Sequence, residues 1–102
     1  MSVGWDVEWG SWVLGDLADV LGRVADILGR QQDVARIEVV PPTESGGLPG
    51  VTVHVDGEMP KRKLRRRLLY GENEVEFISQ SPTGWTAETA GLVLTVVVAG
   101  GQ

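Results

Sequence analysis

The chain lacks cysteine altogether and holds a single histidine, a single tyrosine and a single phenylalanine in 102 residues. Without cysteine it can form neither a disulfide nor a thiolate metal site, and it has no cysteine nucleophile. Long hydrophobic runs are also missing, because the longest uncharged one, residues 92–99, is far shorter than the roughly 20 residues that cross a bilayer. The first residues carry no basic segment ahead of an apolar stretch, so we expect no signal peptide, no membrane contact and a cytoplasmic location.

Hydrophobic residues make up 42% of the chain and charged residues 23%, which is typical of a soluble globular protein. At this length we expect one domain, residues 1–102. The net charge is −5, but the charges are unevenly placed. Six of the nine basic residues lie within one window of seven: Lys61, Arg62, Lys63, Arg65, Arg66 and Arg67. Without these six the net charge would be −11, so the sequence predicts an acidic body with one basic segment.

The beginning of the chain alternates apolar and polar residues over positions 3–9, with Trp5 and Trp9 on the apolar side. This period predicts a strand with one buried face. A helix is the alternative, since Trp5, Trp9 and Trp12 are also spaced i, i+4, i+7. We expect Ser11 to be the N-cap of the helix that follows.

A heptad repeat comes next, in the order LGDLADV, LGRVADI and LGRQQDV, and predicts a long helix over residues 14–31. Successive residues turn by about 100° around a helix, which gathers the large apolar side chains on one face. These side chains belong to Val13, Leu17, Val20, Leu21, Val24, Ile27 and Leu28. The charges lie opposite, in the favourable acid-first order for ion pairs of Asp19 with Arg23 and of Asp26 with Arg30.

Small residues form a third stripe of this helix, between the apolar and charged faces. They recur at helical spacing: Gly15, Ala18, Gly22, Ala25 and Gly29. Interior glycines cost about 1 kcal/mol each relative to alanine, so their retention favours a neighbour that packs closely against the stripe. That neighbour is the sheet of the same chain or the equivalent helix of a second copy, as in coiled coils; an equal alternative is a shallow sheet contact with no functional meaning. We expect Trp12, beside the charged face, to be exposed.

The remainder of the chain predicts strands around a second helix. The expected strands cover residues 35–40, 51–55, 74–79 and 92–99, with a further short one at 85–89. The first two should form a hairpin. The last does not alternate, so both of its faces are expected to be buried. A short basic helix over residues 60–70 is anchored by Leu64 and Leu68.

Together these elements predict an α+β fold: an antiparallel sheet of four to six strands, with the long heptad-patterned helix on one face and the short basic helix beside it. Their order, strand, helix, strand, strand, helix, strand, is that of ferredoxin-like domains. This order carries no sequence motif, so it implies nothing about activity.

Residues able to do chemistry are few. His54 lies on a polar strand face and is expected to be solvated, since no serine is placed to pair with it. Glu72, Glu74 and Glu76 alternate and would share one strand face, but an oxygen-only cation site needs more ligands and a shaped loop. We expect a solvated acidic face, or a partner for the basic helix, and predict neither an enzyme nor a cofactor or metal site.

The basic run over residues 61–67 is the one motif that points to a ligand, because its six cations would neutralise phosphates. A sequence pI near 4.7 argues against a polyanion, as does the lack of an exposed aromatic residue among the cations. We therefore favour contact of the run with an acidic surface of the same chain or of a second copy.

The expected function is a non-enzymatic protein-protein interaction module that self-associates through helix 14–31 or a sheet edge. Its expected contact residues are Trp12, the small-residue stripe and the six cations of the basic run. The runner-up is a nucleic-acid-binding accessory protein that uses the basic run. A third alternative is an acidic inhibitor of a basic protein, of the immunity type.

Overall fold

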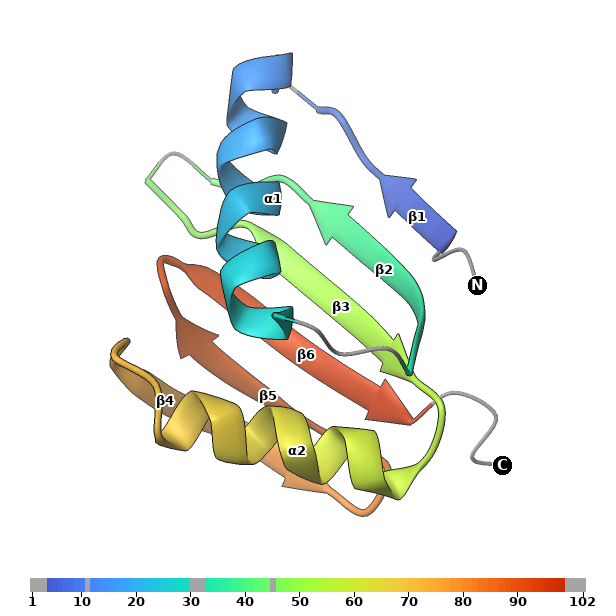
Figure 1. Ribbon diagram of the computed structural model, residues 1–102. Helices are drawn as coiled ribbons and strands as arrows, with labels where there is room; N and C mark the ends of the chain where they lie inside the picture. The colour runs from blue at the N-terminus through green and yellow to red at the C-terminus, as the bar shows by residue number, and fades with distance from the viewer. Residues whose placement is uncertain (1–3, 11, 30–32, 45, 99–102) are drawn as a thin grey trace.

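The computed structural model describes residues 4–10, 12–29, 33–44 and 46–98. Its elements are β1 (Gly4–Val7), α1 (Leu14–Leu28), β2 (Val34–Val40), β3 (Gly50–Val55), α2 (Glu58–Leu69), β4 (Val75–Ser81), β5 (Gly84–Thr89) and β6 (Leu92–Val98). All six strands form one sheet in the order β1-β2-β3-β6-β5-β4, and both helices lie on the same face of it (Figure 1). The α+β class and the two helices are therefore confirmed.

The sheet is mixed and has six strands, so the expectation of an antiparallel sheet of four to six strands holds in part. β1 pairs parallel with β2, and β3 pairs parallel with β6, whereas the other three pairs are antiparallel. A helical crossover returns the chain to the end where the previous strand began, so α1 makes β2 parallel to β1. The ferredoxin-like order is also incomplete as a description, because two more strands follow β4 and β1 lies at a sheet edge.

The expected hairpin is present, and the structure adds a second one. β2 and β3 pair antiparallel, with Val40 opposite Gly50, as the alternating patterns predict. β4 and β5 are joined by a two-residue turn at Pro82 and Thr83, with Ser81 opposite Gly84. The short strand at residues 85–89 is thus a full member of the sheet.

The core lies between the helices and one face of the sheet. Val20, Val24 and Ile27 of α1 and Leu64 and Leu68 of α2 are buried against it. On the sheet, the strands supply alternate residues, the most buried of which are Ile37, Val39, Val51, Val53, Val55, Ala87, Leu92, Leu94 and Val96. No element of the described chain covers the other face.

β6 shows why its sequence does not alternate. It is a central strand, between β3 and β5, and it buries Leu92, Leu94 and Val96 under the helices. Val93 and Val97 point to the uncovered face and are half-buried. The expectation that both faces would be buried was therefore right for one face only.

The long helix is shorter than the heptad repeat. It starts after Val13, whose N–H donates to the Asp16 carboxylate at 3.1 Å, and it ends at Gly29, where φ is +57°. The expected N-cap, Ser11, lies outside the described residues, as does Arg30 of the second expected ion pair. The Asp19–Arg23 ion pair is present. The third heptad therefore contributes only Leu28 to the helix, because Gly29 adopts a positive φ that ends it.

The β5–β6 turn carries a strained residue. Ala90 and Gly91 have φ of +53° and +72°, the conformation of a type I′ turn that normally selects Asn-Gly. The Arg23 guanidinium of α1 donates to the carbonyls of Ala90 and Gly91, at 3.4 and 3.2 Å. These two hydrogen bonds therefore attach the β5–β6 turn to α1.

We expect Ala90→Asn to raise the free energy of unfolding by about 1 kcal/mol, because asparagine tolerates positive φ better than alanine. For a domain of this size the melting temperature should rise by about 4–8 °C. Lys63→Asn, at an exposed position in the middle of α2, is the control and should lower stability through its weaker helix propensity. Thermal unfolding followed by circular dichroism checks both; an unchanged or lower melting temperature for Ala90→Asn would contradict the turn assignment.

Candidate functional site

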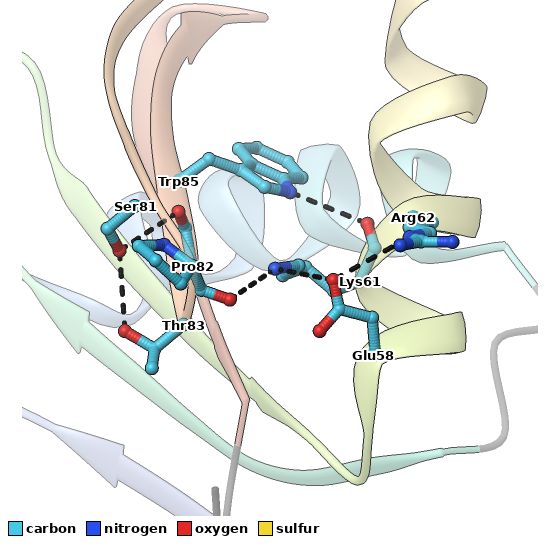
Figure 2. A network of polar contacts seen from close by, with 8 residues as sticks. Glu58, Lys61, Arg62, Ser81, Pro82, Thr83 and Trp85 are labelled. Carbon is cyan, nitrogen blue, oxygen red and sulfur yellow. Dashed lines mark hydrogen bonds and ion pairs between the residues drawn. The ribbon is translucent and has the colours of Figure 1, made fainter.

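The first turn of the basic helix is attached to the β4–β5 turn through Lys61. Its side chain is only 8% exposed, and its Nζ donates to the Pro82 carbonyl at 2.7 Å and pairs with Glu58 at 3.2 Å. The Trp85 indole N–H donates to the Lys61 carbonyl at 3.4 Å, so both the backbone and the side chain of Lys61 contact this hairpin (Figure 2). One of the six cations is therefore a structural residue.

Arg65 has a similar position one turn later. Its guanidinium lies over the Phe77 ring of β4, 4.9 Å from the centroid, and Phe77 meets Trp85 edge-on at 5.6 Å. Such a contact uses the attraction of a cation to an aromatic face. Arg65 is half-buried, and so it belongs to the packing between α2 and β4 more than to the outer surface.

Arg67 lies on the opposite side of α2, toward α1. A Cβ added to Gly29 would collide with the Arg67 guanidinium, so the guanidinium occupies the space beside the C-terminal end of α1. The last turn of α1 contains no basic residue of its own. Arg67 supplies the positive charge that the negative end of a helix dipole favours.

Four cations of the run are exposed, Arg62, Lys63, Arg66 and Arg67, and of these Arg67 is the one that lies toward α1. Exposed apolar and aromatic side chains accompany them, namely Met59, Leu69 and Tyr70. Tyr70 is 84% exposed, directly after the helix, which corrects the expectation that no exposed aromatic residue lies among the cations. In the described chain, the ion pairs of α2 are those of Glu58 in its own first turn with Lys61 and Arg62.

The acidic segment does not pair with α2. β4 begins at Val75, so Glu72 and Glu74 precede the strand and only Glu76 lies on it, opposite Glu88 of β5. Two carboxylates directly across a strand pair repel each other. Among the described residues, no group of three or more acidic, histidine or cysteine side chains is arranged to hold a metal ion.

The uncovered face of the sheet carries a charged network that sequence reasoning missed. Asp6 pairs with Arg36, Arg36 lies 3.5 Å from Glu38, and Glu38 lies 3.2 Å from His54 Nε2. His54 is half-buried and has a carboxylate partner, so it is not the isolated solvated histidine expected. These residues come from three strands, and only the register of the sheet brings them together.

That network continues into a row of hydroxyl side chains. The strand register aligns Glu38, Thr52, Thr95, Thr86 and Ser79 across five neighbouring strands. The hydroxyls of Thr86 and Thr95 are 3.1 Å apart. The polar row explains how this face of the sheet remains stable in water without a covering layer.

The small-residue stripe of α1 faces solvent. Ala18 and Ala25 are exposed, and a Cβ added to Gly15 or Gly22 would meet nothing within 4 Å. The sheet of the same chain is therefore not the neighbour that these residues accommodate. Gly29 is the exception, since it lies under Arg67.

Next to this stripe is an uncharged strip that we call the outer ridge: Leu14, Ala18, Leu21, Ala25 and Leu28. At about 100° per residue these five positions fall within about 80° of one another around the helix axis. Leu14 is 75% exposed, and Leu21 and Leu28 are half-buried. The outer ridge is thus an apolar strip that is exposed at Leu14, Ala18 and Ala25 and reaches the edge of the core at Leu28.

The tryptophans are placed differently from the expectation. Trp12 is half-buried and lines a hollow with Pro42 and Leu48, whereas Trp9 is exposed. The side chain of Trp5 lies outside the described ones, and Trp85 is buried beneath α2. Trp9, Val13 and Leu14 extend the apolar surface beyond the start of the outer ridge.

No protein-family model matches the chain, and no curated protein or solved structure is significantly similar to it. In the part of the chain that the structure describes, neither helix is long and apolar enough to cross a membrane.

A buried, hydrogen-bonded cation and an exposed cation of α2 should contribute differently to the free energy of unfolding. Lys61→Ala should lower the free energy of unfolding by about 1.5–3 kcal/mol, because it removes a charged hydrogen bond from a buried position. Lys63→Ala, two positions along on the exposed side, should change it by less than about 0.5 kcal/mol. Urea unfolding of both variants measures the difference, and equal costs would show that Lys61 is not the attachment point.

Proposed function

We propose that the protein is a non-enzymatic protein-interaction module that self-associates through the outer ridge of α1. The observation that carries this proposal is the uncharged strip from Leu14 to Leu28, in which Leu14, Ala18 and Ala25 are exposed and Leu21 and Leu28 are half-buried. A surface helix normally places polar and charged side chains there. An apolar strip in that position is typical of a contact surface.

The spacing of the ridge supports a second helix as the occupant. Leu14, Leu21 and Leu28 recur every seven residues, the period with which two helices keep one seam in contact. Ala18 and Ala25 lie between them, and Gly15 and Gly22 leave open space beside them. Small residues let two backbones approach closely, so the α1 helix of a second copy fits the strip.

The positions of the acidic residues of α1 favour a helix–helix contact that involves the outer ridge alone. Asp19 and Asp26 lie on the side of the helix away from Leu21 and Leu28, at the edge of such a contact, where they remain solvated. Asp19 is already paired with Arg23. A symmetric pairing of two copies therefore buries apolar and small residues without burying a carboxylate, whose desolvation would oppose association.

A second candidate is binding of single-stranded nucleic acid by the outer side of α2. Tyr70 favours it, because an exposed aromatic ring beside cations provides a surface on which a base can stack. Against it, Arg67 is directed toward α1, which leaves Arg62, Lys63 and Arg66 on the outer side of α2, and Arg62 lies 3.6 Å from Glu58. Three phosphate contacts give weak binding.

For the ridge, Leu14→Glu should convert an associated protein to a monomer, because each copy would place a charge in the apolar seam. The fold should be unaffected, since Leu14 is exposed and acidic residues suit the first turn of a helix. Met59→Glu makes the same change at a 60% exposed position of α2 and should leave association intact. Sedimentation equilibrium at micromolar concentration measures the mass.

Gly22→Leu completes this test. Its side chain has open space in a single copy, so the monomer should remain folded, but it should block the close approach of a second helix. A wild-type mass of 11.0 kDa at every concentration would overturn the proposed self-association.

For α2, we expect no gel mobility shift with oligodeoxythymidine at physiological salt, given the three outward cations and the net charge of −5. A shift that weakens with salt and is lost in both Tyr70→Ala and Arg66→Glu would instead make nucleic-acid binding the leading function.

A further inference from the structure

β4 is an edge strand whose outer side has no strand partner among the described residues. It is seven residues long, whereas the opposite edge, β1, has four. Edge strands expose unpaired N–H and C=O groups, and proteins usually protect them with charges, prolines or bulges. β4 has one charged residue, Glu76, and one bulge, between Phe77 and Ser79. Ile78, in the bulge, is 58% exposed.

One side of α2 lies next to the free edge of β4. The Arg65 contact with Phe77 shows which side of the helix faces β4, and Arg67, beside Gly29, marks the side that faces α1. At about 100° per residue, Leu69 and Arg62 lie within about 60° of Arg65, on the side away from Arg67. Arg62, Arg65 and Leu69 therefore border the space along the free edge of β4.

The charge along this space changes from one end to the other. Lys61 contacts Pro82, after the end of β4, and Arg65 contacts Phe77, near its middle. The helix thus runs antiparallel to the strand, with Arg62 near its C-terminal end. Glu74 and Glu76 lie at its beginning, so the cationic part of the space is the part beside residues 77–81.

We propose that the free edge of β4 is a docking site for an extended acidic segment of a partner protein. The segment adds to the sheet as a further strand, and its backbone pairs with β4. Its alternate carboxylates face Arg62 and Arg65, which a strand with a two-residue side-chain period allows. This site is separate from the outer ridge of α1 and does not depend on self-association.

Charge complementarity selects this occupant. A second copy pairing through its own β4 would bring only one carboxylate, Glu76, from the strand Val75–Ser81. An acidic segment places several carboxylates beside Arg65, which has no acidic partner among the described residues, and beside Arg62, whose described partner is Glu58 of its own helix at 3.6 Å. The exposed hydroxyl and amide side chains of Ser79, Gln80 and Ser81 next to the edge suit a polar peptide.

The probe is an acetylated, fluorescein-labelled octapeptide of alternating glutamate and threonine, titrated with the full chain and followed by fluorescence anisotropy. We expect saturable binding. The same peptide with alternate backbone amides methylated keeps its charges but loses strand pairing, and it should bind at least about tenfold more weakly. A lysine-threonine octapeptide should not bind.

Two charge reversals on α2 locate the site. Arg62→Glu, on the β4 side, should weaken binding about fivefold or more, because fivefold is the upper end of the contribution of one exposed ion pair and the reversal adds repulsion. Lys63→Glu, on the other side of the same helix, makes an equal change in net charge and should have little effect. Thermal unfolding of both variants verifies that the helix is intact.

The proposal is overturned by equal binding of the methylated peptide, by equal losses in the two variants, or by no binding of the alternating peptide at millimolar protein. Equal losses would indicate general attraction of a polyanion to α2. Binding should persist in Leu14→Glu, so failure of self-association and failure of this site are distinguishable. Concentration-dependent mass that persists in Leu14→Glu and is lost with Arg62→Glu would assign the β4 edge to a second copy.

Discussion

Two helices have to cover one apolar face of a six-stranded sheet, and this constraint determines the use of four long cationic side chains, Arg23, Lys61, Arg65 and Arg67. Five strand spacings of about 4.8 Å make the sheet about 24 Å wide, whereas two helices of about 10 Å cover about 20 Å. Long cationic side chains cover what remains, because their aliphatic stems pack while their charged ends reach polar groups. Arg23 reaches the β5–β6 turn, Lys61 and Arg65 reach the β4–β5 hairpin, and Arg67 fills the space above Gly29.

The same constraint explains why the basic run is less basic on the surface than in the sequence. The sequence predicted a basic helix at this position, and the spacing of Leu64 and Leu68 predicted which side of the helix is buried. A sequence does not show that Lys61 meets the Pro82 carbonyl or that Arg65 meets Phe77, because both contacts join segments that become neighbours only through sheet order. Tyr70 was visible in the sequence, but its exposure depends on the helix ending at Leu69.

Local pattern and long-range pairing also account for what was predicted of the fold. Alternation identified β2, β3 and β5 within one residue or so, because one buried face imposes a period of two. The parallel pairings of β1 with β2 and of β3 with β6 leave no local signal, so the mixed sheet was missed. The heptad repeat predicted α1. Its glycines suggested that another element packs closely against the helix, but the sequence does not show which one: Gly22 faces open space, and Gly29 lies under Arg67.

Each helix covers a different part of the sheet, so two separate surfaces remain: the outer ridge of α1 and the edge of β4 beside α2. α1 lies on the side of β2 and β3, and α2 lies on the side of β4 and β5 (Figure 1). The outer ridge of α1 is apolar and nearly uncharged, so a contact there depends on fit and is insensitive to salt. The edge of β4 combines backbone groups with Arg62 and Arg65, so binding there depends on strand pairing and weakens with salt. One partner does not block the other, because the surfaces belong to different helices. We therefore expect salt dependence to separate the two proposed contacts in a single sample: at high salt the ridge contact should persist while the β4 contact should weaken.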